Sequence, residues 1–178
     1  MSDAIRVGLI GYGYASKTFH APLISGTPGM VLAAVSSRDA DKVHADWPGI
    51  KVISQVGELL NDPDIDLVVI DTPNDTHFPL AKAALEAGKH AIVDKPFTVT
   101  LSQARELESL AKHCGRVLSV FHNRRWDSDF LTVRSLINEG QLGEVCYFES
   151  HFDRFRPQVR QRWREQAGPG SGIWYDLG

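Results

Sequence analysis

A pair of glycines near the N-terminus is the first feature that could bind a ligand. Gly11 and Gly13 directly follow the apolar run Val7 to Ile10, and a helical pattern starts just after them. Gly11 permits a tight turn with unusual backbone angles. Gly13 has no Cβ, so backbone N–H groups there can approach a pyrophosphate. The stretch therefore predicts a strand, a turn and a helix that together bind a dinucleotide.

The match to the motif Gly-x-Gly-x-x-Gly is incomplete, because Ser16 holds the third position. The residues that we assign to the cofactor at this turn are Gly11, Gly13, Tyr14 and Ser16. The alternative is a glycine-rich turn that binds nothing. The position of the turn, at the head of repeated strand–helix units, favours the ligand-binding interpretation.

The end of the second predicted strand, 31–35, is expected to choose the cofactor. In NAD-binding proteins an acidic residue there accepts hydrogen bonds from the ribose 2′-hydroxyl. Here the strand continues into Ser36, Ser37 and Arg38, and two hydroxyls with a guanidinium suit a 2′-phosphate. NADP is therefore expected in preference to NAD. The alternative is that Ser37 caps the next helix, Arg38 is solvated and Asp39 binds the ribose.

Alternating strands and helices position these residues. Apolar, β-favouring runs predict six strands, at 5–10, 31–35, 51–53, 67–70, 91–93 and 117–121. Helices are predicted between them at about 15–25, 39–45, 56–60 and 102–112, with another that Asp75 caps and Gly88 ends. This alternation indicates an α/β protein with a Rossmann doubly wound parallel sheet in the order 3-2-1-4-5-6.

The pattern changes after residue 121. A predicted helix at about 127–138 leads to the alternating stretch 145–152, which is typical of an antiparallel strand with one wet face. We therefore expect an NAD(P)-binding Rossmann domain at 1–121 and the start of an α+β second domain at 122–178. That second part is too short to be a complete domain.

Composition is that of a soluble globular protein. The 178 residues are 43% hydrophobic and carry a formal net charge of −3, so a cytoplasmic protein is expected. No apolar stretch approaches the roughly 20 residues that cross a bilayer, so no membrane partner is expected. Cys114 and Cys146 lack metal-ligand spacing, so we expect reduced thiols and no metal.

Five arginines between Arg154 and Arg164 form a basic cluster, which can indicate nucleic-acid binding. Asp153 and Glu165 flank the cluster and the chain is net acidic, so no nucleic-acid partner is expected. A contact with a polyol, with a cofactor phosphate or with another subunit is favoured, and a solvated loop is the alternative.

Several motifs, taken together in their order, resemble the glucose-fructose oxidoreductase/inositol dehydrogenase (Gfo/Idh/MocA) family. They are Gly11-Tyr-Gly13, Thr72-Pro-Asn-Asp-Thr-His77, Asp94-Lys-Pro96 and Gly172-Ile-Trp-Tyr-Asp-Leu-Gly178. The stretches Phe121-His-Asn-Arg-Arg-Trp126 and Phe152-Asp-Arg-Phe-Arg-Pro157 look more specifically like its NADP-dependent scyllo-inositol dehydrogenase branch. The family's usual Glu-Lys-Pro stands here as Asp-Lys-Pro.

The resemblance implies hydride transfer between NADP and a cyclitol or sugar, interconverting a secondary alcohol and its ketone. Lys95, at the carboxyl end of the fifth strand, can exchange a proton with the substrate oxygen, although an ordinary surface lysine is the alternative. Pro96 is expected to carry a cis peptide. In the family an aspartate that matches Asp176 bonds the lysine, and a catalytic histidine would fall two residues beyond Gly178.

The apolar run that ends at Gly178 is an implausible natural terminus, so we expect this chain to be a fragment of a longer enzyme. Because the expected histidine and most of the substrate wall are missing from it, we expect the fragment to be inactive. The family's subunit contacts imply a homo-oligomer formed through the second domain. A module that senses NADP without chemistry is the competing function. Lys95 and Asp176 favour the enzyme, since a sensor needs no such pair.

Further cofactor-binding candidates follow the fourth and sixth strands. Thr72, Pro73, Asn74 and His77 are expected to line the nicotinamide side of the crevice, and Asn123 lies at the corresponding end of the sixth strand. For His77, local hydrogen bonding at a helix start is an equal alternative.

Overall fold

The computed structural model describes residues 4–151, 153, 155, 157–158, 167–172 and 175. Six parallel strands form one sheet in the order β3-β2-β1-β4-β5-β6, which confirms the predicted Rossmann topology. The strands are β1 (Ile5–Ile10), β2 (Met30–Ser36), β3 (Lys51–Ile53), β4 (Leu67–Ile70), β5 (His90–Asp94) and β6 (Leu118–Phe121).

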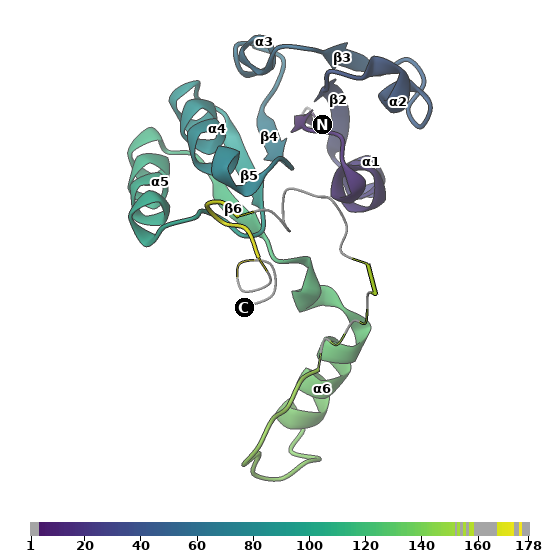
Figure 1. Cartoon of the computed structure of the whole chain (residues 1–178), viewed down its shortest axis with the longest axis vertical. Coiled ribbons are helices and arrows are strands. Elements are labelled where there is room, and N and C mark those ends of the chain that lie inside the picture. The colour runs from purple at the N-terminus through teal and green to yellow at the C-terminus, as the bar shows by residue number, and fades with distance from the viewer. Residues whose placement is uncertain are drawn as a thin grey trace.

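Helices connect the strands and cover the sheet, and two further helices follow the last strand (Figure 1). They are η1 (Ser16–His20), α1 (Ala21–Gly26), α2 (Ala40–His44), α3 (Val56–Leu60), α4 (Asn74–Glu86), α5 (Leu101–Cys114), η2 (Asn123–Trp126) and α6 (Ser128–Asn138). The predicted first helix is thus divided into a π-helical turn, η1, and the short α1.

Two apolar cores lie on the two faces of the sheet. Side chains of α4 and α5, such as Leu85 and Leu107, pack in one core, and side chains of α1 and α2, such as Ile24 and Val43, pack in the other. All four residues of β4 are buried. A parallel strand with both faces covered is expected to read as a continuous apolar run, which is why β4 could be recognised in the sequence.

The N-caps of α2 and α4 can be compared with what the sequence predicts. Asp39 caps α2 by accepting a hydrogen bond from the Lys42 amide at 3.0 Å. The prediction that Asp75 caps α4 is wrong, because Pro73 is the N-cap and the helix begins at Asn74. Asp75 instead lies in the first turn, where a carboxylate interacts favourably with the helix dipole.

The predicted strand at 145–152 is wrong over residues 145–151, which form no strand, and residue 152 lies outside the described residues. Alternation alone cannot make a strand, because a ladder needs a second strand to pair with. Among the described residues none pairs with this stretch, and Tyr147 and Phe148 are exposed. The helix α6 before it buries no residue and points away from the sheet (Figure 1).

Two glycines offer a matched test of the packing between β1 and α3. A Cβ on Gly8 would lie 2.7 Å from Leu59 Cδ2 in the buried core, whereas a Cβ on Gly57 would meet nothing within 4 Å. We expect Gly8→Ala to lower the free energy of unfolding by about 1–3 kcal/mol through overpacking. Gly57→Ala, inside α3, should raise it by up to about 1 kcal/mol. Urea denaturation of both variants checks this pair, and equal effects would contradict it.

Candidate cofactor and active site

The glycine turn lies where β1 and β4 end side by side. Gly11 has φ +93°, and a Cβ there would lie 2.0 Å from the carbonyl oxygen of Asp71, so glycine is required for both conformation and space. The Gly11 amide donates to Ser36 O at 3.0 Å, which ties the turn to the end of β2. The backbone is therefore held where a dinucleotide phosphate can approach it.

Ser16 takes the place of the motif's third glycine and is fully buried. Its amide donates to Asp71 Oδ2 at 2.6 Å, and its hydroxyl bonds to the same oxygen and lies 3.1 Å from Gly11 O. Sequence reasoning missed Asp71. The signal was available, since a charged residue directly follows the buried strand β4 at the edge where ligands collect.

A second group of polar side chains braces the turn from the side of α2. The Tyr12 hydroxyl donates to Asp46 Oδ2 at 3.0 Å. Burial of the ring and, second, this hydrogen bond to Asp46 raise the pKa of Tyr12 to about 12. Lys42 Nζ donates to Tyr12 O at 2.9 Å, so this lysine, which the sequence did not indicate, places a cation beside the turn. Tyr14 is exposed and packs edge-on against Phe19.

The end of β2 carries the residues predicted to choose the cofactor. Ser36 is buried, Ser37 is half-buried and Arg38 is exposed. The Ser37 hydroxyl bonds locally, accepting from the Asp39 amide at 3.1 Å, and the Asp39 carboxylate is engaged as the cap of α2. Arg38 is therefore the residue of this segment best placed to contact a ligand phosphate.

Side chains after β4 bind neighbouring backbone. His77 is 1% exposed, with Nδ1 2.8 Å from Pro96 O and Nε2 2.9 Å from Thr72 O, so the ring links the ends of β4 and β5. This geometry favours the local-bonding interpretation of His77. Asn74, at the start of α4 just after Pro73, donates through Nδ2 to Gly170 O at 2.6 Å.

The segment after β5 brings together Asp94, Lys95 and Pro96. Asp94 is 6% exposed and accepts the Lys95 amide at 2.8 Å. Burial first, and then the charge of Asp71, raise the pKa of Asp94 to about 6. Lys95 is half-buried, and the Lys95–Pro96 peptide is cis, as expected.

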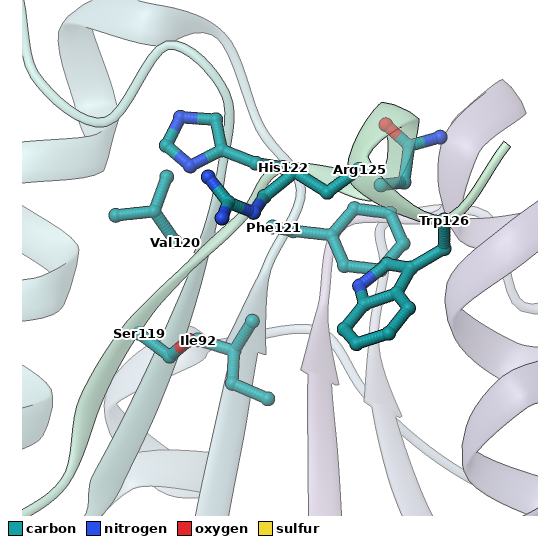
Figure 2. A pocket seen from close by; sticks show the side chains of 8 residues that line it. Ile92, Ser119, Val120, Phe121, His122, Arg125 and Trp126 are labelled. Carbon is teal, nitrogen blue, oxygen red and sulfur yellow. The ribbon is translucent and has the colours of Figure 1, made fainter. Parts of the chain in front are cut away.

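A pocket lies at the end of β6 on the face toward α1. Figure 2 shows Ile92 and Ser119 on the strands, with Phe121 and Trp126 beside them. The ring of Phe121 lies 4.2 Å from that of buried His20. Asn123, the first residue of η2, also lines this pocket.

Some predicted residues cannot be placed. Asp176 and all five arginines of the cluster between Arg154 and Arg164 lie outside the described residues. Within the part of the chain that the structure describes, no group of His, Cys, Asp and Glu could hold a metal ion. None of the helices described there combines the length and the hydropathy that a membrane span needs.

The strand order, the glycine turn between β1 and β4, and the polar strand ends define an α/β protein of the dinucleotide-binding class. Comparison with known families agrees. Residues 5–122 match the model described as "Oxidoreductase family, NAD-binding Rossmann fold", and residues 134–178 match "Oxidoreductase family, C-terminal alpha/beta domain". The chain belongs to the Gfo/Idh/MocA oxidoreductase family.

Individual relatives support this assignment. An uncharacterized oxidoreductase of Escherichia coli (strain K12), YdgJ, is 79% identical to this chain. The match covers 99% of this chain and 51% of YdgJ. The scyllo-inositol 2-dehydrogenase (NADP(+)) IolW of Bacillus subtilis (strain 168) is 39% identical over 99% of this chain and 49% of its own. A solved oxidoreductase structure from Yersinia pestis superposes with a TM-score of 0.93 at 71% identity, covering 99% of this chain and 50% of that one. The chain thus spans about half the length of these relatives.

The raised pKa of Asp94 predicts a pH-dependent stability. A carboxyl whose pKa rises from 3.8 to about 6 on folding contributes stability that is complete below pH 3.8 and is lost as pH rises through about 6. Asp94→Asn stays neutral and can still accept the Lys95 amide. Its free energy of unfolding relative to wild type should therefore increase between pH 4 and pH 7, by on the order of 2 kcal/mol.

Denaturation with urea across this pH range measures the difference. Asp75→Asn, which removes an exposed carboxylate on α4, is the control and should show no such increase. A difference for Asp94→Asn that stays constant with pH would contradict the prediction.

Proposed function

We propose that the protein carrying this chain is an NADP-dependent oxidoreductase that interconverts a secondary alcohol of a cyclitol or sugar with its ketone. The observation that carries the proposal is the position of Lys95, directly after β5, at the same sheet edge as the glycine turn after β1. Parallel strands place their carboxyl ends together, so a proton donor and a dinucleotide site share one crevice. The named activity of the Bacillus subtilis relative supports the cyclitol class.

Within this proposal the dinucleotide supplies the hydride acceptor or donor. The Lys95 ammonium group gives a proton to the substrate carbonyl oxygen, and its neutral amine takes one from the hydroxyl in reverse. Asp94 fixes the Lys95 backbone, and His77 holds the following carbonyl of Pro96. In this scheme Asp176 is the hydrogen-bonding partner of the Lys95 side chain.

On the cofactor side, we assign the phosphates to the turn of Gly11, Gly13, Tyr14 and Ser16. Arg38 is the principal donor to a 2′-phosphate, since a guanidinium offers a forked set of N–H groups. Ser36 and Ser37 hold the backbone of this segment, because Ser36 O accepts the Gly11 amide and Ser37 N donates to Ile53 O at 3.1 Å. The nicotinamide side is assigned to Thr72, Pro73, Asn74, Lys95 and Asn123, and His77 holds the backbone behind them through Thr72 O and Pro96 O.

The proposal includes the organisation of the whole protein. We place the Rossmann domain at 1–121 and the start of the substrate domain at 122–178, with homo-oligomer formation through the second domain and a cytoplasmic location. A polyol or sugar is the proposed partner molecule.

Cofactor choice gives the first functional prediction. NADPH should bind at least about tenfold more tightly than NADH, and Arg38→Ala should remove most of this difference. Fluorescence titration of both cofactors into the 178-residue chain measures the affinities. Arg105→Ala, an equal change of charge at an exposed position of α5, should leave the ratio unaltered. Equal affinity of the wild type for the two cofactors would overturn the assignment to NADP.

Proton transfer gives the second functional prediction. In a protein that joins this chain to the rest of the second domain, Lys95→Met should lower kcat by about a hundredfold or more. The affinity for NADPH should change little, because the variant keeps most of the side-chain volume. Lys112→Met, at an exposed lysine paired with Glu108, is the control. Steady-state reduction of NADP with scyllo-inositol and related polyols measures kcat.

Two results would count against this role. An unchanged kcat in Lys95→Met would mean that the proton comes from another group. NADPH binding by that longer protein without turnover of any polyol would favour a sensing module.

A further inference from the structure

Asp71 directs its carboxylate at the glycine turn, although the motif gives it no part in cofactor binding. Oδ2 accepts the Ser16 amide at 2.6 Å and also bonds the Ser16 hydroxyl. The same oxygen would lie 3.8 Å from a Cβ placed on Gly13. The open space at Gly13, through which a phosphate approaches the backbone, is therefore bordered by a carboxylate.

The surroundings of Asp71 make its charge effective over this distance. Asp71 itself is half-buried, and its charge acts on two buried groups, Asp94 of β5 and His20 of η1. The charge of Asp71 contributes to the raised pKa of Asp94, and it opposes the burial that lowers the pKa of His20. Charges that are poorly solvated interact more strongly than charges in water. A phosphate at the turn would therefore be repelled by this half-buried carboxylate.

The same carboxylate also has a favourable structural effect. The buried amide of Ser16 needs an acceptor, which Asp71 provides, and the buried hydroxyl that Ser16 adds is shared between Asp71 Oδ2 and Gly11 O. Leaving such groups unpaired is costly. Asp71 thus stabilises the turn and at the same time places a negative charge beside the phosphate position.

We propose that Asp71 is a positioning residue of the cofactor turn whose carboxylate limits the affinity for the dinucleotide. It holds the turn through Ser16, and its charge opposes the cofactor phosphates. The inference rests on the proposed binding of NADP and adds a residue that sets its strength.

The test compares NADPH binding by the 178-residue wild type and by two variants. Asp71→Asn removes the charge and keeps an oxygen that can accept from Ser16, so the dissociation constant should fall about tenfold. Asp71→Ala removes both the charge and the acceptor, and its dissociation constant should lie between those of the wild type and Asp71→Asn. Asp75→Asn, the same change of charge at an exposed position, should stay within about twofold of the wild type.

Each outcome bears on one claim. No measurable binding of NADPH by the folded wild type would refute the proposed function itself. Binding by the wild type, with a dissociation constant in the folded Asp71 variants equal to or higher than that of the wild type, would overturn the proposal about Asp71. Circular dichroism establishes folding, and if only one variant folds, its dissociation constant should still lie below that of the wild type. A lower dissociation constant in Asp71→Ala than in Asp71→Asn would overturn the positioning role.

Discussion

The close contact between Gly11 and the carbonyl oxygen of Asp71 is the constraint on which the rest of the site depends. A Cβ at residue 11 would come within 2.0 Å of that oxygen, so only glycine allows the turn after β1 to lie against the end of β4. These two strands are neighbours in the sheet at the point where the strand order reverses. Ligands of open α/β sheets bind at such a point. The missing side chain therefore determines where the crevice opens.

Around this contact, polar groups at the strand ends form hydrogen bonds mainly with one another. His77 links the carbonyls of Thr72 and Pro96, and Asp94 accepts the amide of Lys95. At the other end of the strands, just before β5, buried Lys89 donates through Nζ to the carbonyls of Asp62 and Ile65, each at 2.7 Å. Buried polar groups that are fully paired specify one arrangement of the backbone. The position of Lys95 is thus a property of two strand ends rather than of one loop.

Much of the fold could be predicted from the sequence because buried parallel strands read as unbroken apolar runs. Leu67 to Ile70 is such a run, and all of it is buried. The stretch 145–152 also showed a strand pattern, but pairing depends on a partner strand, which alternation within one segment cannot reveal. The position of Asp71 after a buried strand was visible in the sequence, but its contact with the glycine turn was not. Its role depends on Ser16, 55 residues earlier in the chain, and no local motif records that contact.

The strand order also separates the two halves of the proposed chemistry. Arg38 follows β2 and Lys95 follows β5, and β1 and β4 lie between those strands in the sheet. The β2 end makes backbone contacts with Gly11 and Ile53, whereas the β5 end pairs with the ends of β4 and β6 and is held by His77 through Pro96 O. The strands β2 and β5 share no neighbouring strand, so a change at one end reaches the other through the ends of β1 and β4. Such a scaffold allows cofactor preference to diverge during evolution, or to be redesigned, while the machinery for proton transfer is inherited intact.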